Sequence, residues 1–123
     1  MPAHVLIVED SELVIGALRV LLEASGYHVS SAGNVREAID AARTGRPDVM
    51  LLDLSLPDGD GLEVLHDLQK SSEVPRVSVV MTGRDGAETR QRCERAGCHT
   101  VLLKPVSARD LPRMIGEWLG ARG

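Results

Sequence analysis

The chain has 123 residues, of which 43% are hydrophobic and 26% charged, an ordinary composition for one soluble globular domain. A formal net charge of -4 gives no overall attraction for nucleic acid or an anionic membrane, and 2% aromatic residues leave no stacking platform for bases or flavins. No apolar run is long enough to span a bilayer and no signal peptide precedes the first strand, so we expect a cytoplasmic protein with neither nucleic acid nor membrane as a partner.

Strand-like and helix-like patterns alternate along the chain. Short apolar runs predict five strands, at residues 4–8, 28–31, 49–53, 77–81 and 100–103. Helical spacing of apolar residues predicts five helices, at about 12–25, 34–45, 61–70, 86–96 and from about 110 onward. The run from Val49 to Leu52 shows no alternation, which favours a strand buried on both faces. This βα repeat predicts a parallel sheet with helices on both faces.

Polar residues mark the expected helix starts. Capping patterns stand at Ser11, at Asn34 with Glu37, at Asp85 with Glu88, and at Ser107 with Asp110. The first helix is predicted to carry Val14, Leu18, Leu21 and Leu22 on one face and to stop at Gly26. Pro112 is compatible with a helix only in its first turn, so the last helix is expected to begin near Asp110 or with a distorted start.

Reactive residue types follow four of the predicted strands. Glu9 and Asp10 follow the first strand, Asp53 ends the third, Thr82 follows the fourth and Lys104 follows the fifth. Since right-handed crossovers place all carboxyl ends of parallel strands at one edge, these side chains should meet there. Three carboxylates without Cys or His suit Mg²⁺ rather than Zn²⁺. A metal and an ammonium would attract a phosphoryl group, and the Asp53 carboxylate could act as its nucleophile.

Less specific interpretations of the same residues remain open at this point. The acids and Lys104 could form a structural ion-pair network, and Asp53 alone could simply begin a turn. Gly59 and Gly61 lack the lysine and spacing of a phosphate-binding loop and are interpreted as turn and helix-entry residues. The four histidines show no metal-ligand spacing, and the two cysteines are too few for a disulfide framework.

Four motifs together resemble the receiver domain of bacterial two-component response regulators, the CheY-like superfamily. They are Val8-Glu9-Asp10, Asp53 followed by Pro57-Asp58-Gly59-Asp60-Gly61, Met81-Thr82-Gly83, and Lys104-Pro105. The resemblance covers essentially the whole chain. It implies a flavodoxin-like (βα)5 fold with sheet order 2-1-3-4-5, and one receiver domain over residues 1–123 without an output domain.

The resemblance also implies roles for individual residues. Asp53 would accept a phosphoryl group from a histidine kinase or a histidine phosphotransfer protein, and Thr82 and Lys104 would contact that group. The Lys104-Pro105 peptide bond would be cis. Mg²⁺ would be bound directly by Asp10, Asp53 and the backbone carbonyl of Ser55, with Glu9 acting largely through water.

Two positions depart from the family pattern. The aromatic residue that the family usually places three positions before the lysine is Val101 here, and the residue after the Lys-Pro pair, often Phe, is Val106. A valine cannot make the family's ring flip. We therefore expect phosphorylation to reposition the loop after Thr82 and the fourth helix without an aromatic rotamer change.

The partners and alternatives follow from the same resemblance. A downstream protein is expected to bind the face formed by residues 84–119, whose predicted helix carries Arg84, Arg90, Arg92 and Arg95. We expect a monomer or weak homodimer, and no enzymatic turnover beyond self-catalysed phosphorylation and dephosphorylation. The alternatives are a receiver-like interaction module, a receiver excised from a hybrid histidine kinase, or a small aspartyl-phosphate phosphatase. The phosphatase alternative is disfavoured because this chain has no second acid two positions after Asp53 and no room for a cap domain.

Overall fold

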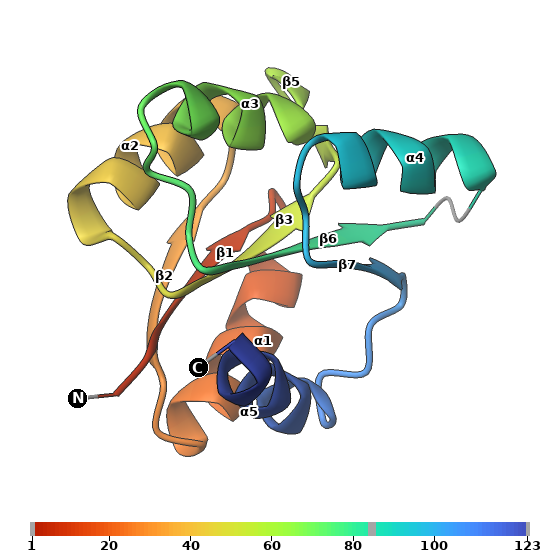
Figure 1. The fold of residues 1–123 in the computed structure, drawn as a ribbon. Helices are drawn as coiled ribbons and strands as arrows, with labels where there is room; N and C mark the ends of the chain where they lie inside the picture. The colour runs from red at the N-terminus through yellow and green to blue at the C-terminus, as the bar shows by residue number, and fades with distance from the viewer. Residues whose placement is uncertain (1, 84–85, 123) are drawn as a thin grey trace.

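A computed structural model describes residues 2–83 and 86–122, which form a five-stranded sheet between two layers of helices (Figure 1). The sheet is parallel throughout, in the order β2-β1-β3-β6-β7. Its strands are β1 (His4–Val8), β2 (His28–Ala32), β3 (Val49–Asp53), β6 (Val77–Thr82) and β7 (Thr100–Leu103). Counting only these five strands, the order is the 2-1-3-4-5 order of the flavodoxin-like fold, so the predicted fold class is confirmed.

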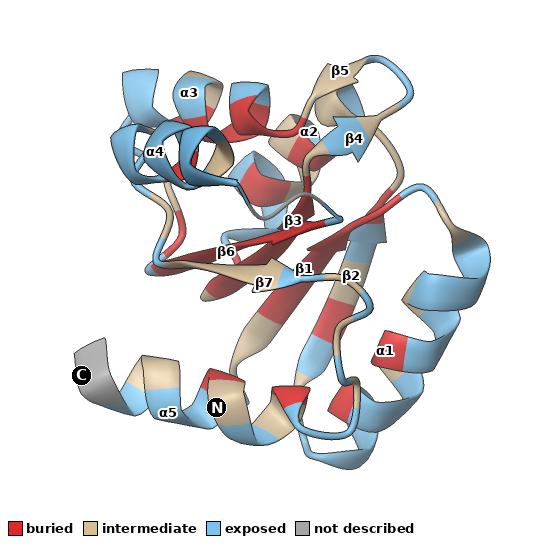
Figure 2. Ribbon diagram, turned by 90° about the vertical axis from the view of Figure 1, so that its right-hand side faces the viewer, coloured by how far each residue is buried: buried red, intermediate tan, exposed pale blue. Residues whose placement is uncertain are grey.

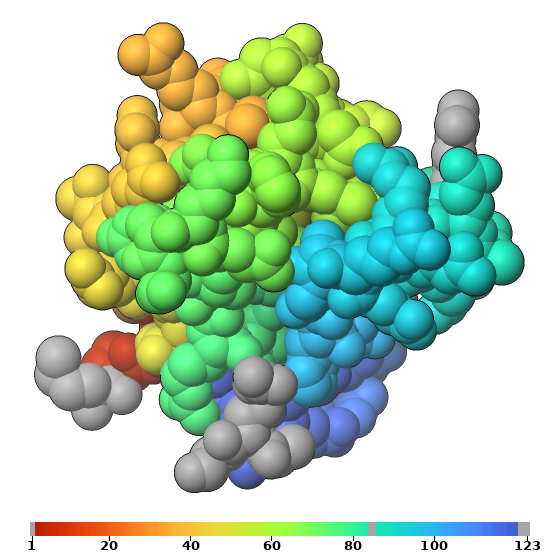
Figure 3. All heavy atoms as spheres, turned by 45° about the horizontal axis from the view of Figure 1, so that its top comes forward, coloured from red at the N-terminus to blue at the C-terminus, as the bar shows by residue number. Residues whose placement is uncertain are grey.

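Five helices cover the two faces of the sheet. They are α1 (Glu12–Ala24), α2 (Val35–Gly45), α3 (Leu62–Lys70), α4 (Ala87–Arg95) and α5 (Leu111–Arg122). Helices α1 and α5 lie on one face, and α2, α3 and α4 on the other (Figure 1). Figure 3 looks onto the second layer, where α3 and α4 lie side by side. Among the described residues, no helix is long and apolar enough to span a membrane.

The core is divided by the sheet into two apolar clusters, because successive strand residues point to opposite faces. Figure 2 shows the central strands β1, β3 and β6 coloured as buried along most of their length. Along β3, Met50 and Leu52 pack under α2 and α3, whereas Val49 and Leu51 pack toward α1 and α5. All five β3 residues are buried. The prediction of a strand covered on both faces is therefore confirmed.

The local signals at the starts of α1 and α2 are also confirmed. The Ser11 side chain accepts a hydrogen bond from the Val14 amide at 3.4 Å, and Asn34 accepts one from the Glu37 amide at 2.8 Å. These side chains satisfy amide groups that have no partner inside the helix. Gly26 follows α1 with a φ of 93°, a backbone conformation that favours glycine.

The buried stripe of α1 is narrower than its apolar face. Leu18 and Leu22 are buried, but Val14 is 38% exposed and Leu21 is 37% exposed. Helix α1 contacts the edge strand β2 and the neighbouring helix α5, so only one narrow stripe of its surface meets the core. Of the four residues predicted to share one face, only Leu18 and Leu22 are buried.

Helix α5 begins at Leu111, which places Pro112 in its first turn, where a missing amide donor does no harm. A start near Asp110 is thus confirmed. The predicted cap at Ser107 was wrong, because this residue lies in the turn before the helix. There its hydroxyl is 3.1 Å from the Asp110 carboxylate, and its carbonyl accepts the Asp110 amide at 3.2 Å.

Two further differences concern loops. The segment expected to be only a turn after β3 contains a small antiparallel hairpin of β4 (Ser55–Leu56) and β5 (Gly59–Asp60). Helix α4 is preceded by Gly86, which provides no side-chain cap, and the predicted cap residue Asp85 lies outside the described residues. The Lys104-Pro105 bond is cis, as predicted.

Candidate functional site

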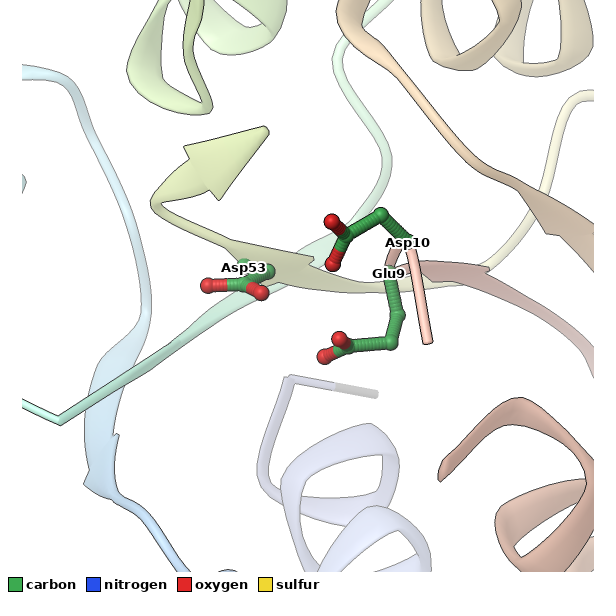
Figure 4. A group of neighbouring side chains, drawn as sticks. All are labelled: Glu9, Asp10 and Asp53. Carbon is green, nitrogen blue, oxygen red and sulfur yellow. The ribbon is translucent and has the colours of Figure 1, made fainter. Parts of the chain in front are cut away.

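The carboxyl edge of the sheet brings together the side chains that the sequence placed after four strands. Glu9 and Asp10 follow β1, Asp53 is the last residue of β3, Thr82 ends β6 and Lys104 follows β7. The amide of Glu9 donates to the Ala32 carbonyl of β2 at 3.0 Å, which continues the sheet pairing one residue beyond β1. The three acids point toward a common region (Figure 4).

Lys104 joins the two buried acids of this cluster. Its Nζ donates to Glu9 Oε2 and to Asp53 Oδ2, both at 3.0 Å. The Glu9 side chain is 3% exposed and that of Asp53 is 8% exposed. Because a buried carboxylate is costly without a partner, the shared ammonium allows both acids to lie at the base of the site.

Burial and charge shift the titration of this cluster. The pKa of Glu9 is raised, first by burial and then by the neighbouring Asp53 charge, against the lowering effect of Lys104. Burial would lower the pKa of Lys104, but its hydrogen bonds to Asp53 and Glu9 outweigh burial and raise it. Lys104 is therefore a firmly protonated cation in this site.

Asp10 completes a set of possible metal ligands. One carboxylate oxygen from each of Glu9, Asp10 and Asp53 lies within 4.8 Å of the other two. Unlike the other two acids, Asp10 is exposed to solvent. A set of carboxylate oxygens open to water on one side fits a hard divalent cation such as Mg²⁺, which keeps several water ligands. Within the described part of the chain, this is the one cluster of three such groups.

The backbone after β3 fixes the orientation of Asp53. Its Oδ1 accepts the Ser55 amide at 3.1 Å, while Oδ2 accepts Lys104, so both oxygens are held. The Gly61 amide donates to the Leu54 carbonyl at 2.8 Å. A side chain at Gly61 would collide with the Asp53 carbonyl, so glycine is required here for close packing and not only as a helix-entry residue. The Ser55 carbonyl as a metal ligand stays a prediction.

Thr82 lies beside a groove that opens next to Asp53. The residue is 5% exposed, and its carbonyl accepts the Lys104 amide at 2.8 Å. The groove has a volume of about 590 Å³, and Ser55, Thr82 and Arg92 are among its lining residues. The end of β6 at Thr82 and residues of α4 therefore line the same groove. The role of Thr82 toward a phosphoryl group stays a prediction.

Two acids of the loop after β3 have contacts that sequence reasoning missed. Asp58 accepts the Val35 amide at 2.7 Å and the Arg36 amide at 3.2 Å, so it caps α2 from a distant loop. Asp60 forms an ion pair with Arg92 of α4. The sequence marked both acids only as parts of a turn motif, and no local spacing pairs them with these helices.

Comparisons with known proteins agree with this arrangement. Residues 5–116 match the family model described as the response regulator receiver domain. The chain is 40% identical to the polar-differentiation response regulator DivK of Brucella anthropi, covering 98% of both chains, and 37% identical to DivK of Brucella ovis.

Solved structures give the same result. A CheY-like response regulator receiver domain protein from Methanospirillum hungatei has a TM-score of 0.91 and 28% identity over 99% of this chain and 97% of that one. Chemotaxis protein CheY4 of Vibrio cholerae has a TM-score of 0.87 and 26% identity over 95% of this chain and 98% of that one.

Proposed function

The chain belongs to the response regulator receiver domain family, and from this premise we propose that Asp53 is a phosphoacceptor that switches a protein-binding face. The observation that carries the proposal is the pair of hydrogen bonds from Lys104 to Glu9 and Asp53 at the carboxyl edge of the sheet. This contact joins the carboxylate that we propose as the nucleophile to a further acid and a cation, beside the exposed Asp10. A histidine kinase or a histidine phosphotransfer protein is the proposed donor.

The proposed transfer needs little covalent chemistry from the protein. An Asp53 oxygen forms a bond to phosphorus as the bond from phosphorus to the donor histidine breaks, and the imidazole nitrogen leaves with the bonding electron pair. The Ser55 amide and the Lys104 ammonium hold the two Asp53 oxygens before transfer. Lys104, and in our proposal the Thr82 hydroxyl, would then contact the phosphoryl oxygens and stabilise their charge.

Mg²⁺ fits the donor set at this site. Asp10 and Asp53, together with the Ser55 carbonyl, are the proposed ligands, and Glu9 would act largely through water. When bound, the ion would neutralise charge on the transferred phosphoryl group. The chain's own contribution is to hold and orient the Asp53 carboxylate, because Lys104 donates to Asp53 and Glu9 and offsets the repulsion between them.

The proposed output is a change at the face within residues 84–119, which is formed by α4, β7 and α5 as far as residue 119. Leu103 on the edge strand β7 is 50% exposed, and α4 has a largely polar surface with Cys93 as its buried residue. Such a polar, edge-lying face is suited to a reversible protein contact. We propose a cytoplasmic monomer or weak homodimer without turnover on an outside substrate. Arg84, which the sequence also assigned to this face, lies outside the described residues.

The deciding experiment is incubation with acetyl phosphate and Mg²⁺, followed by intact mass spectrometry. Wild type and Asp40→Asn should gain one phosphoryl group, since Asp40 is exposed on α2 and remote from the site. Asp53→Asn and a sample treated with chelator should gain none. An unmodified wild-type protein would favour the alternative that the chain is a receiver-like interaction module, and continuous phosphate release from other phosphomonoesters would favour a phosphatase.

A further inference from the structure

The hairpin of β4 and β5 contacts both Asp53 and helix α4. On β4, the Ser55 amide donates to Asp53 Oδ1 at 3.1 Å. Ser55 pairs with Asp60 across the hairpin, and the Asp60 side chain forms an ion pair with Arg92 of α4. A single paired residue, Asp60, therefore separates Arg92 from the residue that holds the Asp53 carboxylate.

Asp60 uses its amide and both carboxylate oxygens to hold the end of this hairpin. Its amide donates to Glu63 Oε2 at 2.7 Å, and its Oδ1 accepts the Leu62 amide at 2.9 Å, both in the first turn of α3. Its Oδ2 accepts a guanidinium nitrogen of Arg92. Because charge-assisted hydrogen bonds fix the orientation of a carboxylate, the position of Asp60 depends on α3 and α4 together.

The ion pair joins two walls of an open groove. The groove of about 590 Å³ beside Thr82 is lined by Ser55 and Asp60 from the hairpin and by Arg92 from α4. On its other side the hairpin is fixed to the start of α2 by Asp58. Since an open groove lacks the close packing that makes a protein interior rigid, contacts between its walls set its width.

The exposure of this ion pair determines what kind of effect it can have. The Arg92 side chain is 47% exposed and that of Asp60 is 37% exposed. Exposed ion pairs add little to the stability of a whole domain. The effect of Arg92 should therefore be local, on the position of the hairpin, and the urea midpoint of the protein should hardly depend on it.

We propose that Arg92 is a positioning residue for the acid cluster: through Asp60 it holds the hairpin so that Ser55 keeps the Asp53 carboxylate oriented for Mg²⁺. The inference rests on the Mg²⁺ site of the proposed function and adds a link from that site to α4. Since coupling between two sites is reciprocal, a partner that moves α4 would change the affinity for Mg²⁺.

Mg²⁺ titrations followed by the NMR amide signals of Asp10 and Ser55 test this inference by the sign of the effect. If charge alone matters, removing a cation near three acids strengthens Mg²⁺ binding slightly, and Arg95→Gln, at an exposed position of the same helix, should show this result. Arg92→Gln should instead weaken Mg²⁺ binding by about two- to fivefold, the range for loss of an exposed ion pair. Arg92→Lys keeps a cation that can pair with Asp60 and should bind Mg²⁺ nearly as wild type does.

A second background shows whether the effect passes through Asp60. In Asp60→Asn, which keeps an oxygen for the Leu62 amide, Arg92→Gln should cause no further loss of Mg²⁺ affinity. The inference is overturned if Arg92→Gln binds Mg²⁺ as tightly as Arg95→Gln, or if it weakens binding equally with and without the Asp60 carboxylate. In both cases wild type still binds Mg²⁺, so the metal site itself stands. A wild type that binds no Mg²⁺ overturns the metal site and this inference with it.

Discussion

Replacing Asp10 with asparagine tests whether the acid cluster destabilises the fold when no divalent cation is bound. An Asp10 oxygen lies within 4.8 Å of an oxygen from each of Glu9 and Asp53. At 4.8 Å, repulsion between two unit charges is about 0.9 kcal/mol in water and about 3.5 kcal/mol at an effective dielectric constant of 20. Asp10 is exposed, so the smaller value applies to each pair, and attraction to Lys104 cancels part of the sum. We expect Asp10→Asn to raise the free energy of unfolding by about 1 kcal/mol in chelator.

Urea denaturation with chelator and with MgCl₂ measures this effect. Mg²⁺ should stabilise wild type through binding to the native state and should stabilise Asp10→Asn much less. Asp40→Asn removes the same charge from an exposed site on α2, and it should change neither the stability in chelator nor the response to Mg²⁺. If Asp10→Asn behaves like Asp40→Asn in both conditions, the acids do not repel one another enough to matter, and Asp10 is not a metal ligand.

Three further predictions concern stability and reactivity. The hydrogen bond from the Val35 amide lowers the pKa of Asp58 from its ordinary 3.8, so its capping contribution should be present above that pH and lost as the pH falls through the lowered pKa. Thermal midpoints of wild type and Asp58→Asn should therefore converge on acidification. Burial raises the pKa of Cys98 to about 12, so Ellman's reagent at about pH 8 should modify it far more slowly in the folded protein than in urea. Leu65→Ala should cost about 2–5 kcal/mol in urea titrations, whereas Leu13→Ala, at an 87% exposed position, should cost less than about 0.5 kcal/mol.

The sequence was sufficient for those features that depend on strand direction. Because every strand in a βα repeat runs the same way, Glu9, Asp53 and Lys104 had to end at one edge, although they are up to 95 positions apart. Capping by Ser11 and Asn34 was equally predictable, because a cap and its amide are close in sequence.

The features that could not be predicted depend on how helices lie on the sheet. Whether Val14 is buried depends on how much of α1 meets its neighbours, and a periodic pattern does not determine that width. The contact from Asp58 to α2 joins residues more than 20 positions apart in the sequence. Asp58 lies in a loop, and a loop has no periodic pattern from which such a contact could be predicted. Ser78 was counted as part of a buried strand, and only its missing partner in the structure distinguishes it from its neighbours.

The short loop after β3 connects the site to both neighbouring helices, and this bears on the valine at position 101. Val101 pairs with Val80 in the sheet and packs against the core below α4, so it has no ring that could move between two positions. The loop offers other contacts. The Ser55 amide holds the Asp53 carboxylate, and Asp60, five residues later on the same hairpin, is paired with Arg92 of α4. The Asp53 carboxylate is therefore connected to α4 through this hairpin, by a route that does not pass through position 101.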